Sequence, residues 1–327
     1  MKMYNLHIVR SPLQLINILE AIETLSLENN ILVIIDRKSM SNNRQIQEVL
    51  HAIDYKWEML FHIEKKSKTS FLDYVKLIKK IKAYHFKHIF TGDIDSISNV
   101  IIANLKHEKI FLVDDGTSTL KRHEALLQDS KLRFKDRMKL LRFNMFGLKA
   151  HKEYKLNFFT FFDISPKADE TIVKNAFTHL KKQFNLSQSK SDKVYILGQP
   201  IYNKEIPEDI FIEHLEKILK HYQGKEIIYV KHRYENIPKA VAAVLQERAE
   251  IYTNKYPIEL DFLIKQEYPR YITGFFSTAL YTLKQMFNES EVTLFHIDGK
   301  HFFKTERAEV VENYYAFFNN NGFNIIK

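Results

Sequence analysis

Residues 110–119 read IFLVDDGTST, an apolar run that passes directly into two acids and a glycine. The run predicts a β-strand, with Asp114 and Asp115 at its carboxyl end. Open parallel sheets bind their ligands at the carboxyl ends of their strands, so these two acids are candidate functional residues. Gly116 permits the tight exit that would expose them.

Short apolar runs alternate with segments of helical period along the whole chain, which predicts α/β domains built on parallel sheets. The predicted strands are 4–9, 31–35, 87–91, 109–114 and 157–164, then 193–198, 225–231, 270–276 and 292–297. The predicted helices are 12–25, 70–84, 208–222, 237–249 and 277–288. The polar, Ser-rich segment QFNLSQSKSDK (183–193) is typical of a linker and divides the chain into domains 1–185 and 186–327.

Composition narrows the class of protein. The 327 residues are 45% hydrophobic and 27% charged, as in a folded globular protein, and they include no cysteine, which excludes disulfides, thiolate metal sites and a cysteine nucleophile. His7, Arg10 and Pro12 interrupt the opening apolar run before it could serve as a signal peptide, so we expect a cytoplasmic protein.

The formal net charge of +9 favours an anionic partner. Cationic and apolar residues mix in KLRFKDRMKLLRF (131–143), as they do on helices that contact anionic membranes, although a solvated helix face fits the same pattern. No segment reaches the roughly 20 apolar residues of a membrane span, so contact would be peripheral. No motif indicates binding of nucleic acid.

Each candidate motif also has a purely structural interpretation. One carboxylate of the 114–115 pair could act as a general base, or both could stabilise an Asp-Gly turn. The strand at 225–231 ends in Lys231, His232 and Arg233, which suit a phosphate or form a surface cluster. Ser277 and Thr278 begin a helix, where they could bind an anion or cap the helix.

Two further strand ends carry weaker signals. Gly198, Gln199 and Pro200 follow a predicted strand, and their backbone could approach a nucleotide. Asp93 and Asp95, in TGDIDS (91–96), follow another strand and would line an acceptor site or cap a loop. No pair or cluster with convincing ligand spacing argues for a bound metal. An acid in the first half, with basic and hydroxyl-bearing strand ends in the second, indicates a cleft that activates an acceptor and holds a nucleotide.

The order of these motifs resembles bacterial sialyltransferases of glycosyltransferase family 52 and the related polysialyltransferases. Asp114-Asp115-Gly116 is similar to their acidic motif, and Ser277-Thr278 to their Ser-Ser/Thr motif. Lys231-His232-Arg233 is similar to their His-Pro motif, except that Arg233 stands where proline is usual. RSPLQL (10–15), GQP (198–200) and PIEL (257–260) also resemble family features.

The resemblance implies a GT-B fold, in which two Rossmann-like domains with parallel sheets face a central cleft. It implies an inverting, metal-independent transfer from CMP-sialic acid to a hydroxyl of a bacterial capsule or lipooligosaccharide glycan, without a cofactor. Asp115 would be the general base, with Asp114 assisting it or bonding the acceptor.

The resemblance assigns the nucleotide to the second domain. His232 would bind or protonate the departing phosphate, and Ser277 and Thr278 would hold it. Glu259 would bond the ribose or cytosine, while Gly198, Gln199, Pro200 and Lys231 would line the nucleotide pocket. A homodimer and peripheral contact with the inner membrane are compatible with it. Three alternatives stay open: another nonulosonic acid as donor, a UDP-sugar as donor, or a non-catalytic basic protein that binds anions or lipid.

Overall fold

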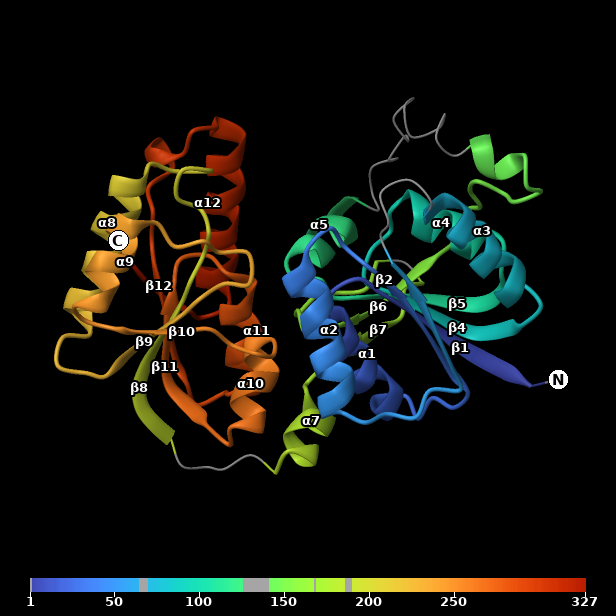
Figure 1. The fold of residues 1–327 in the computed structure, drawn as a ribbon, viewed down its shortest axis with the longest axis horizontal. Helices are drawn as coiled ribbons and strands as arrows, with labels where there is room; N and C mark the ends of the chain where they lie inside the picture. Colours follow the sequence, from blue (N-terminus) through green and yellow to red (C-terminus); the bar gives the residue numbers. More distant parts are fainter. Residues whose placement is uncertain (1, 65–69, 126–140, 168, 186–189) are drawn as a thin grey trace. The chain divides into compact units, whose positions relative to one another are not determined.

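The structure is a computed structural model that describes the chain except for residues 1, 65–69, 126–140, 168 and 186–189 (Figure 1). Its contacts divide the chain into two compact units, Met1–His179 and Leu180–Lys327. This division falls a few residues before the domain boundary that the sequence suggests at 185/186.

The first unit is built on a seven-stranded parallel sheet of order β3-β2-β1-β4-β5-β6-β7. Its strands are β1 (Met3–Val9), β2 (Asn30–Ile35), β3 (Met59–Ile63), β4 (His85–Thr91), β5 (Lys106–Val113), β6 (Leu156–Thr160) and β7 (Ile172–Lys174). Its helices are α1 (Pro12–Thr24), α2 (Met40–Ala52), α3 (Ser70–Ile81), α4 (Ser96–Ala103) and α5 (Ser118–Ala125), while α7 (Thr178–Gln183) crosses into the second unit. The chain order of the strands reverses between β1 and β4, which makes their carboxyl ends the expected ligand site.

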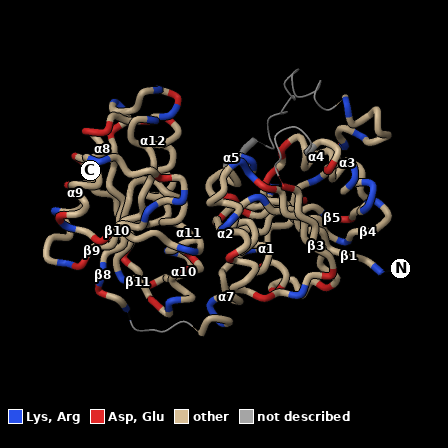
Figure 2. Tube along the Cα trace, in the orientation of Figure 1, with Lys and Arg blue, Asp and Glu red and all other residues tan. Residues whose placement is uncertain are grey.

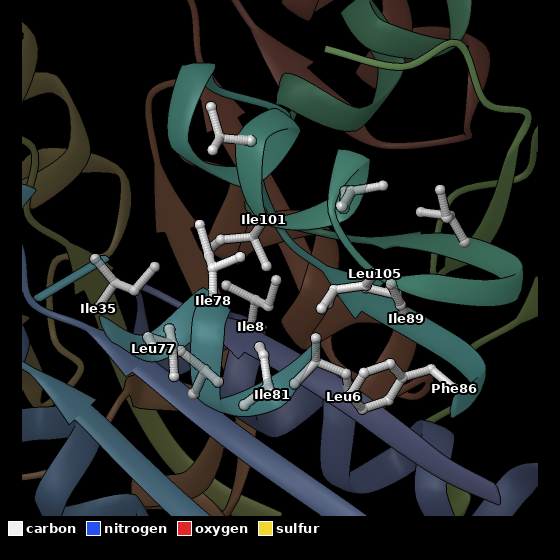
Figure 3. Packing of buried hydrophobic residues seen from close by; sticks show 14 of the residues in the cluster. Leu6, Ile8, Ile35, Leu77, Ile78, Ile81, Phe86, Ile89, Ile101 and Leu105 are labelled. Carbon is white, nitrogen blue, oxygen red and sulfur yellow. The ribbon is translucent and has the colours of Figure 1, made fainter. Parts of the chain in front are cut away.

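Helices cover both faces of this sheet, with α1 and α2 on one side and α3 and α4 on the other (Figure 1). Strands covered on both faces read as continuous apolar runs, and every residue of β2 is buried. Side chains such as Leu6 and Ile8 of β1 pack with Ile78 and Ile81 of α3 and with Ile101 of α4 (Figure 3). This core holds the strand ends of the first unit in place.

The second unit repeats the design with a six-stranded parallel sheet of order β10-β9-β8-β11-β12-β13. Its strands are β8 (Lys190–Leu197), β9 (Ile227–Val230), β10 (Glu250–Tyr252), β11 (Tyr268–Gly274), β12 (Glu291–Phe295) and β13 (Asn324–Ile326). Its helices are α8 (Glu208–His221), α9 (Lys239–Gln246), α10 (Ile258–Ile264), α11 (Thr278–Met286) and α12 (Thr305–Asn320). The order reverses between β8 and β11, so the second expected ligand site lies at their carboxyl ends.

The polar segment 183–193 is only partly a linker. Residues 178–183 form α7, and β8 begins at Lys190, because Lys190 and Ser191 pair with Tyr268 and Pro269 at the start of β11. The basic segment 131–143 lies outside the described residues up to residue 140. No helix in the described part of the chain is both long and apolar enough to cross a membrane.

Candidate functional site

The acids of the first unit lie at the carboxyl ends of β4 and β5, beside the end of β1. Gly116 adopts a φ of +77°, so the tight exit that the sequence predicts after Asp115 is confirmed. Strands β1, β4 and β5 are neighbours in the sheet, so Arg10, Asp93 and Asp115 follow three adjacent strands. The carboxyl ends of these three strands form the candidate acceptor site.

Both carboxylate oxygens of Asp115 have a partner. Ser11 Oγ donates a hydrogen bond to Oδ1 at 2.6 Å, and the Arg37 guanidinium donates to Oδ2 at 2.6 Å. The side chain remains 19% exposed, so a ligand can still reach it. Ser11 caps α1 shortly after β1, and Arg37 follows β2, so residues that follow three strands meet at one carboxylate. The sequence alone gives no role to Ser11, within RSPLQL, or to Arg37, because both contacts join residues far apart in the chain.

Asp114 has a different environment from its neighbour, since it has no exposed surface. Thr160 Oγ1 donates to its Oδ1 at 2.9 Å, and the Phe161 backbone N–H donates to its Oδ2 at 2.7 Å. Burial raises the pKa of Asp114 to about 7. In this structure Asp114 binds β5 to the end of β6 and does not present its carboxylate to a ligand.

The RSPLQL segment organises the end of β1. Arg10 forms a two-pronged ion pair with Asp95, at 2.6 and 2.9 Å, and Ser11 caps α1 by accepting the Gln14 N–H. Gln14 packs so closely on Gly92 that a Cβ at position 92 would clash with it. The Arg10 backbone N–H donates to Gln14 Oε1 at 2.7 Å. The segment therefore couples the ends of β1 and β4.

Asp93 and Asp95 divide the two roles that the sequence left open for them. Asp95 accepts the Ser98 N–H at 2.8 Å and so caps the helix α4, where the sequence suggested the cap of a loop. Asp93 lies 4.0 Å from an Arg122 nitrogen, and burial raises the pKa of its carboxyl group. Asp93 is 38% exposed in its side chain and stays a candidate for contact with an acceptor.

In the second unit, GQP and Ser277-Thr278 lie side by side because they follow β8 and β11, which pair with each other. The Phe276 backbone N–H donates to Gln199 Oε1 at 3.0 Å, which ties the two strand ends together. Ser277 caps α11 by accepting the Ala279 N–H at 3.3 Å, and Thr278 is the first helical residue. Backbone N–H groups at the start of a helix attract anions.

His232 lies in the connection between β9 and α9, at the next strand end of the sheet. Its Nδ1 accepts the Tyr234 backbone N–H at 3.2 Å. Burial, together with the positive charges of Arg233 and Lys204, lowers the pKa of His232 to about 4. At neutral pH the ring is therefore uncharged and carries its proton on Nε2, which makes it a hydrogen-bond donor.

The buried carboxylate of Glu235, to which the sequence alone gives no role, fixes the loop that carries His232. Glu235 Oε2 accepts the His232 backbone N–H at 2.9 Å, and Oε1 accepts the hydroxyls of Tyr229 at 2.6 Å and Tyr202 at 3.1 Å. Burial raises the pKa of Glu235. Position 198 has to be glycine because a Cβ there would clash with Glu235 and approach the Tyr229 hydroxyl to 2.9 Å.

Lys231, Arg233 and Glu259 complete the set that the sequence predicts. The Lys231 backbone N–H donates to the Tyr252 carbonyl at 2.9 Å, which joins the loop to β10. Glu259, at the start of α10, is buried and accepts the Thr282 hydroxyl at 2.7 Å. Burial raises the pKa of Glu259, and the positive charge of Arg233 opposes this rise. The positive charge of Arg233 therefore lies close enough to favour the ionised form of Glu259.

Within the described residues, no three His, Asp or Glu side chains come together where they could hold a metal ion. The structure instead presents two separate sets of groups, one in each unit. The first set is an oriented carboxylate beside arginines. The second is a neutral histidine, two hydroxyls and a helix N-terminus, with Lys231 and Arg233 nearby.

Solved structures show the class of fold. The chain is similar to a UDP-N-acetylglucosamine 2-epimerase-type protein of Listeria monocytogenes, with 14% identity over 90% of this chain and 79% of the other and a TM-score of 0.53. It is also similar to MnaA of S. aureus in complex with UDP, with 12% identity over 90% and 79% of the two chains and a TM-score of 0.51. At such low identity the similarity concerns the fold, which is the GT-B type with two Rossmann-like domains.

The sequence itself identifies the family. The model of glycosyltransferase family 52 matches residues 28–299, and the chain belongs to that family. The matched range includes Asp115 in the first unit and His232, Glu259 and Ser277 in the second. No curated protein sequence matches the chain.

Proposed function

We propose that this glycosyltransferase transfers sialic acid from CMP-sialic acid to a hydroxyl of a bacterial capsule or lipooligosaccharide glycan, with inversion and without a metal. One observation carries the proposal. The acidic motif lies at the strand ends of the first unit, and in the second unit the histidine and hydroxyl motifs follow β9 and β11, the two strands that flank β8. These are the positions at which Rossmann-like sheets bind ligands.

Asp115 acts as the general base in this proposal. The acceptor oxygen bonds to the anomeric carbon, the bond from that carbon to the CMP phosphate oxygen breaks, and the hydroxyl proton passes to Asp115. Ser11 and Arg37 support this role because they hold the carboxylate in one orientation. Asp114 contributes indirectly, by fixing the end of β5 that carries Asp115.

The departing CMP phosphate is stabilised by groups of the second unit. His232 donates from Nε2, and the hydroxyls of Ser277 and Thr278 and the N-terminus of α11 supply further donors. The low pKa of His232, about 4, favours hydrogen bonding over protonation of the phosphate. Lys231 and Arg233 add positive charge, and Arg233 does so at the position where proline is usual in the family motif. Gly198, Gln199, Pro200 and Glu259 contact the nucleoside.

The test is calorimetric titration of the purified protein with CMP and, separately, with UDP, both in EDTA. We expect CMP to bind and UDP to bind at least about tenfold more weakly, because a site shaped for a cytosine leaves polar groups unpaired when uracil replaces it. Preference for UDP would transfer the proposal to a UDP-sugar donor. Binding of neither nucleotide would support the non-catalytic alternatives.

The acceptor in this proposal is a lipid-linked glycan at the inner face of the plasma membrane. The net charge of +9 supports it, because such a charge attracts the protein to anionic lipid. Salt-dependent attachment to membranes follows from the same charge.

A further inference from the structure

Helix α3 exposes a cationic face that the nucleotide and acceptor motifs do not use. Its residues Val75, Ile78 and Ile81 are buried against the sheet. On the opposite side Leu72 is 48% exposed, and Lys76, Lys79 and Lys80 are exposed at helical spacing from it. Figure 2 shows the Lys and Arg positions along α3.

The segment that follows residue 140 adds apolar side chains beside this face. Phe143 is fully buried and packs on Phe71 of α3, with ring centroids 4.6 Å apart, and Phe146 contacts the same ring at 5.5 Å. This anchoring leaves Leu141 51% exposed, Met145 85% and Phe146 38%. Leu141 and Met145 are four residues apart, so a helical turn points both the same way.

Cations lie among these apolar groups. The Arg142 guanidinium lies 4.3 Å from the centre of the Phe71 ring, and the Lys79 ammonium lies 5.8 Å from that of Phe146. Lys80 similarly lies 4.9 Å from the Phe61 ring. Lys76, Lys79 and Lys80 form no ion pair with any described residue, and the nearby carboxylates are Asp73 and Glu64, which line a hollow beside Lys76 and Lys80.

We propose that this surface binds an anionic lipid bilayer. The α3 surface comprises Leu72, Lys76, Lys79, Lys80, Leu141, Arg142, Met145 and Phe146. Exposed apolar side chains would enter the boundary between headgroups and acyl chains, while the surrounding Lys and Arg contact lipid phosphates. An anionic bilayer accounts for both the exposed apolar side chains and the surrounding cations. An apolar protein partner would cover the apolar side chains but leave the cations unneutralised.

The α3 surface shares no residue with the proposed CMP site. A failure to bind vesicles can therefore be distinguished from a failure to bind CMP. We would measure co-sedimentation with phosphatidylcholine vesicles, with and without phosphatidylglycerol, at low and high salt. We expect binding only to the vesicles with phosphatidylglycerol, and detachment at high salt.

Single substitutions test whether the α3 surface is the part of the protein that binds vesicles. We expect Lys76→Gln and Lys80→Gln each to weaken vesicle binding about fivefold, and Met145→Ser to weaken it on the order of tenfold. Met40→Ser is the matched control, because Met40 is 88% exposed on α2, and Lys220→Gln on α8 is the control for charge. Both controls should bind vesicles as the unmodified protein does, and CMP binding should be equal in all five variants.

Three results would overturn the proposal. The first is equal binding to neutral and anionic vesicles, and the second is vesicle binding that survives all three variants of the surface. The third is a dimer that Met145→Ser dissociates, by analytical ultracentrifugation, while vesicle binding remains, which would make a second copy of the chain the occupant.

Discussion

Asp114 and Asp115 are neighbours in the sequence but have opposite environments. Asp115 reaches the surface and bonds Ser11 and Arg37, whereas Asp114 is fully buried and bonds the chain at the end of β6. Successive side chains of an extended chain point to opposite sides, so one residue can face a ligand only if the other faces the protein. The paired acids of the motif therefore combine one exposed carboxylate with one structural carboxyl group.

The buried carboxyl group predicts a pH dependence of stability. Burial raises the pKa of Asp114 from 3.8 to about 7, so between these values the folded protein binds a proton that the unfolded chain releases. Its stabilising contribution is present in full below pH 3.8 and is lost as the pH rises through about 7. Raising the pH from about 5 to about 8 should lower the free energy of unfolding on the order of 2 kcal/mol more in the unmodified protein than in Asp114→Asn.

Urea unfolding followed by circular dichroism at both pH values would measure this difference. Asp54→Asn, at an exposed acid of the same unit, should retain the pH dependence of the unmodified protein. An unchanged pH dependence in Asp114→Asn would show that Asp114 is ionised in the folded protein throughout this range.

At the scale of elements, the connection from β9 to α9 depends on Glu235. This carboxylate accepts the His232 backbone N–H and two tyrosine hydroxyls, so it sets the course of the loop that presents His232. Gly198, which follows β8, leaves the space that Glu235 occupies. The glycine of the GQP motif thus has a packing role, independent of any approach to a nucleotide.

The packing role of Gly198 predicts the effect of a single methyl group. In Gly198→Ala the added Cβ would clash with Glu235 and lie 2.9 Å from the Val230 carbonyl oxygen, so strand or loop has to move. We expect a loss of about 1–3 kcal/mol in the free energy of unfolding, together with weaker CMP binding. Gly299→Ala is the control, since the nearest atom to its Cβ would be Ala308 Cβ at 3.4 Å. Equal denaturant midpoints for the two variants would contradict this account.

The sequence predicts elements well where their pattern is local. The continuous apolar runs at 31–35 in β2 and 110–113 in β5 identify these strands, because helices on both faces of the sheet bury every residue of the two runs. The three-residue edge strands β7, β10 and β13 are absent from the predictions, because strands this short carry no periodicity. Helix α12 is also absent, since half-buried Tyr314 and Phe317 blur the helical spacing of its buried Val311, Tyr315 and Phe318.

At the scale of the whole molecule, both units use one strand order, with three strands on one side of a reversal and the rest on the other. The sequence alone places Asp115, His232 and Ser277 after predicted strands, and in the structure these strands lie at or near the reversal of each sheet. The same reasoning could not find Ser11, Arg37 or Glu235. Ser11 and Arg37 are 104 and 78 residues from Asp115, and only the folded sheet brings them together.

The division into two units predicts that catalysis and nucleotide binding separate on mutation. Asp115→Ala should lower transfer from CMP-sialic acid by about 10²–10⁴-fold, the range that loss of a general base produces. It should leave CMP affinity unchanged, because the nucleotide groups belong to the other unit. His232→Ala should weaken CMP binding by about tenfold or more, since it removes a hydrogen bond to a charged group, and transfer should fall with it.

Transfer assays and CMP titrations on the same preparations would separate the two effects. Asp54→Ala and His221→Ala, which remove exposed side chains of the same types from the same units, are the matched controls. Normal turnover in Asp115→Ala would remove Asp115 as the base and direct attention to Asp93, a partly exposed acid that follows the neighbouring strand β4. Unchanged CMP affinity in His232→Ala would instead mean that Ser277, Thr278 and the α11 N-terminus hold the phosphate without the histidine, because these donors follow a different strand, β11.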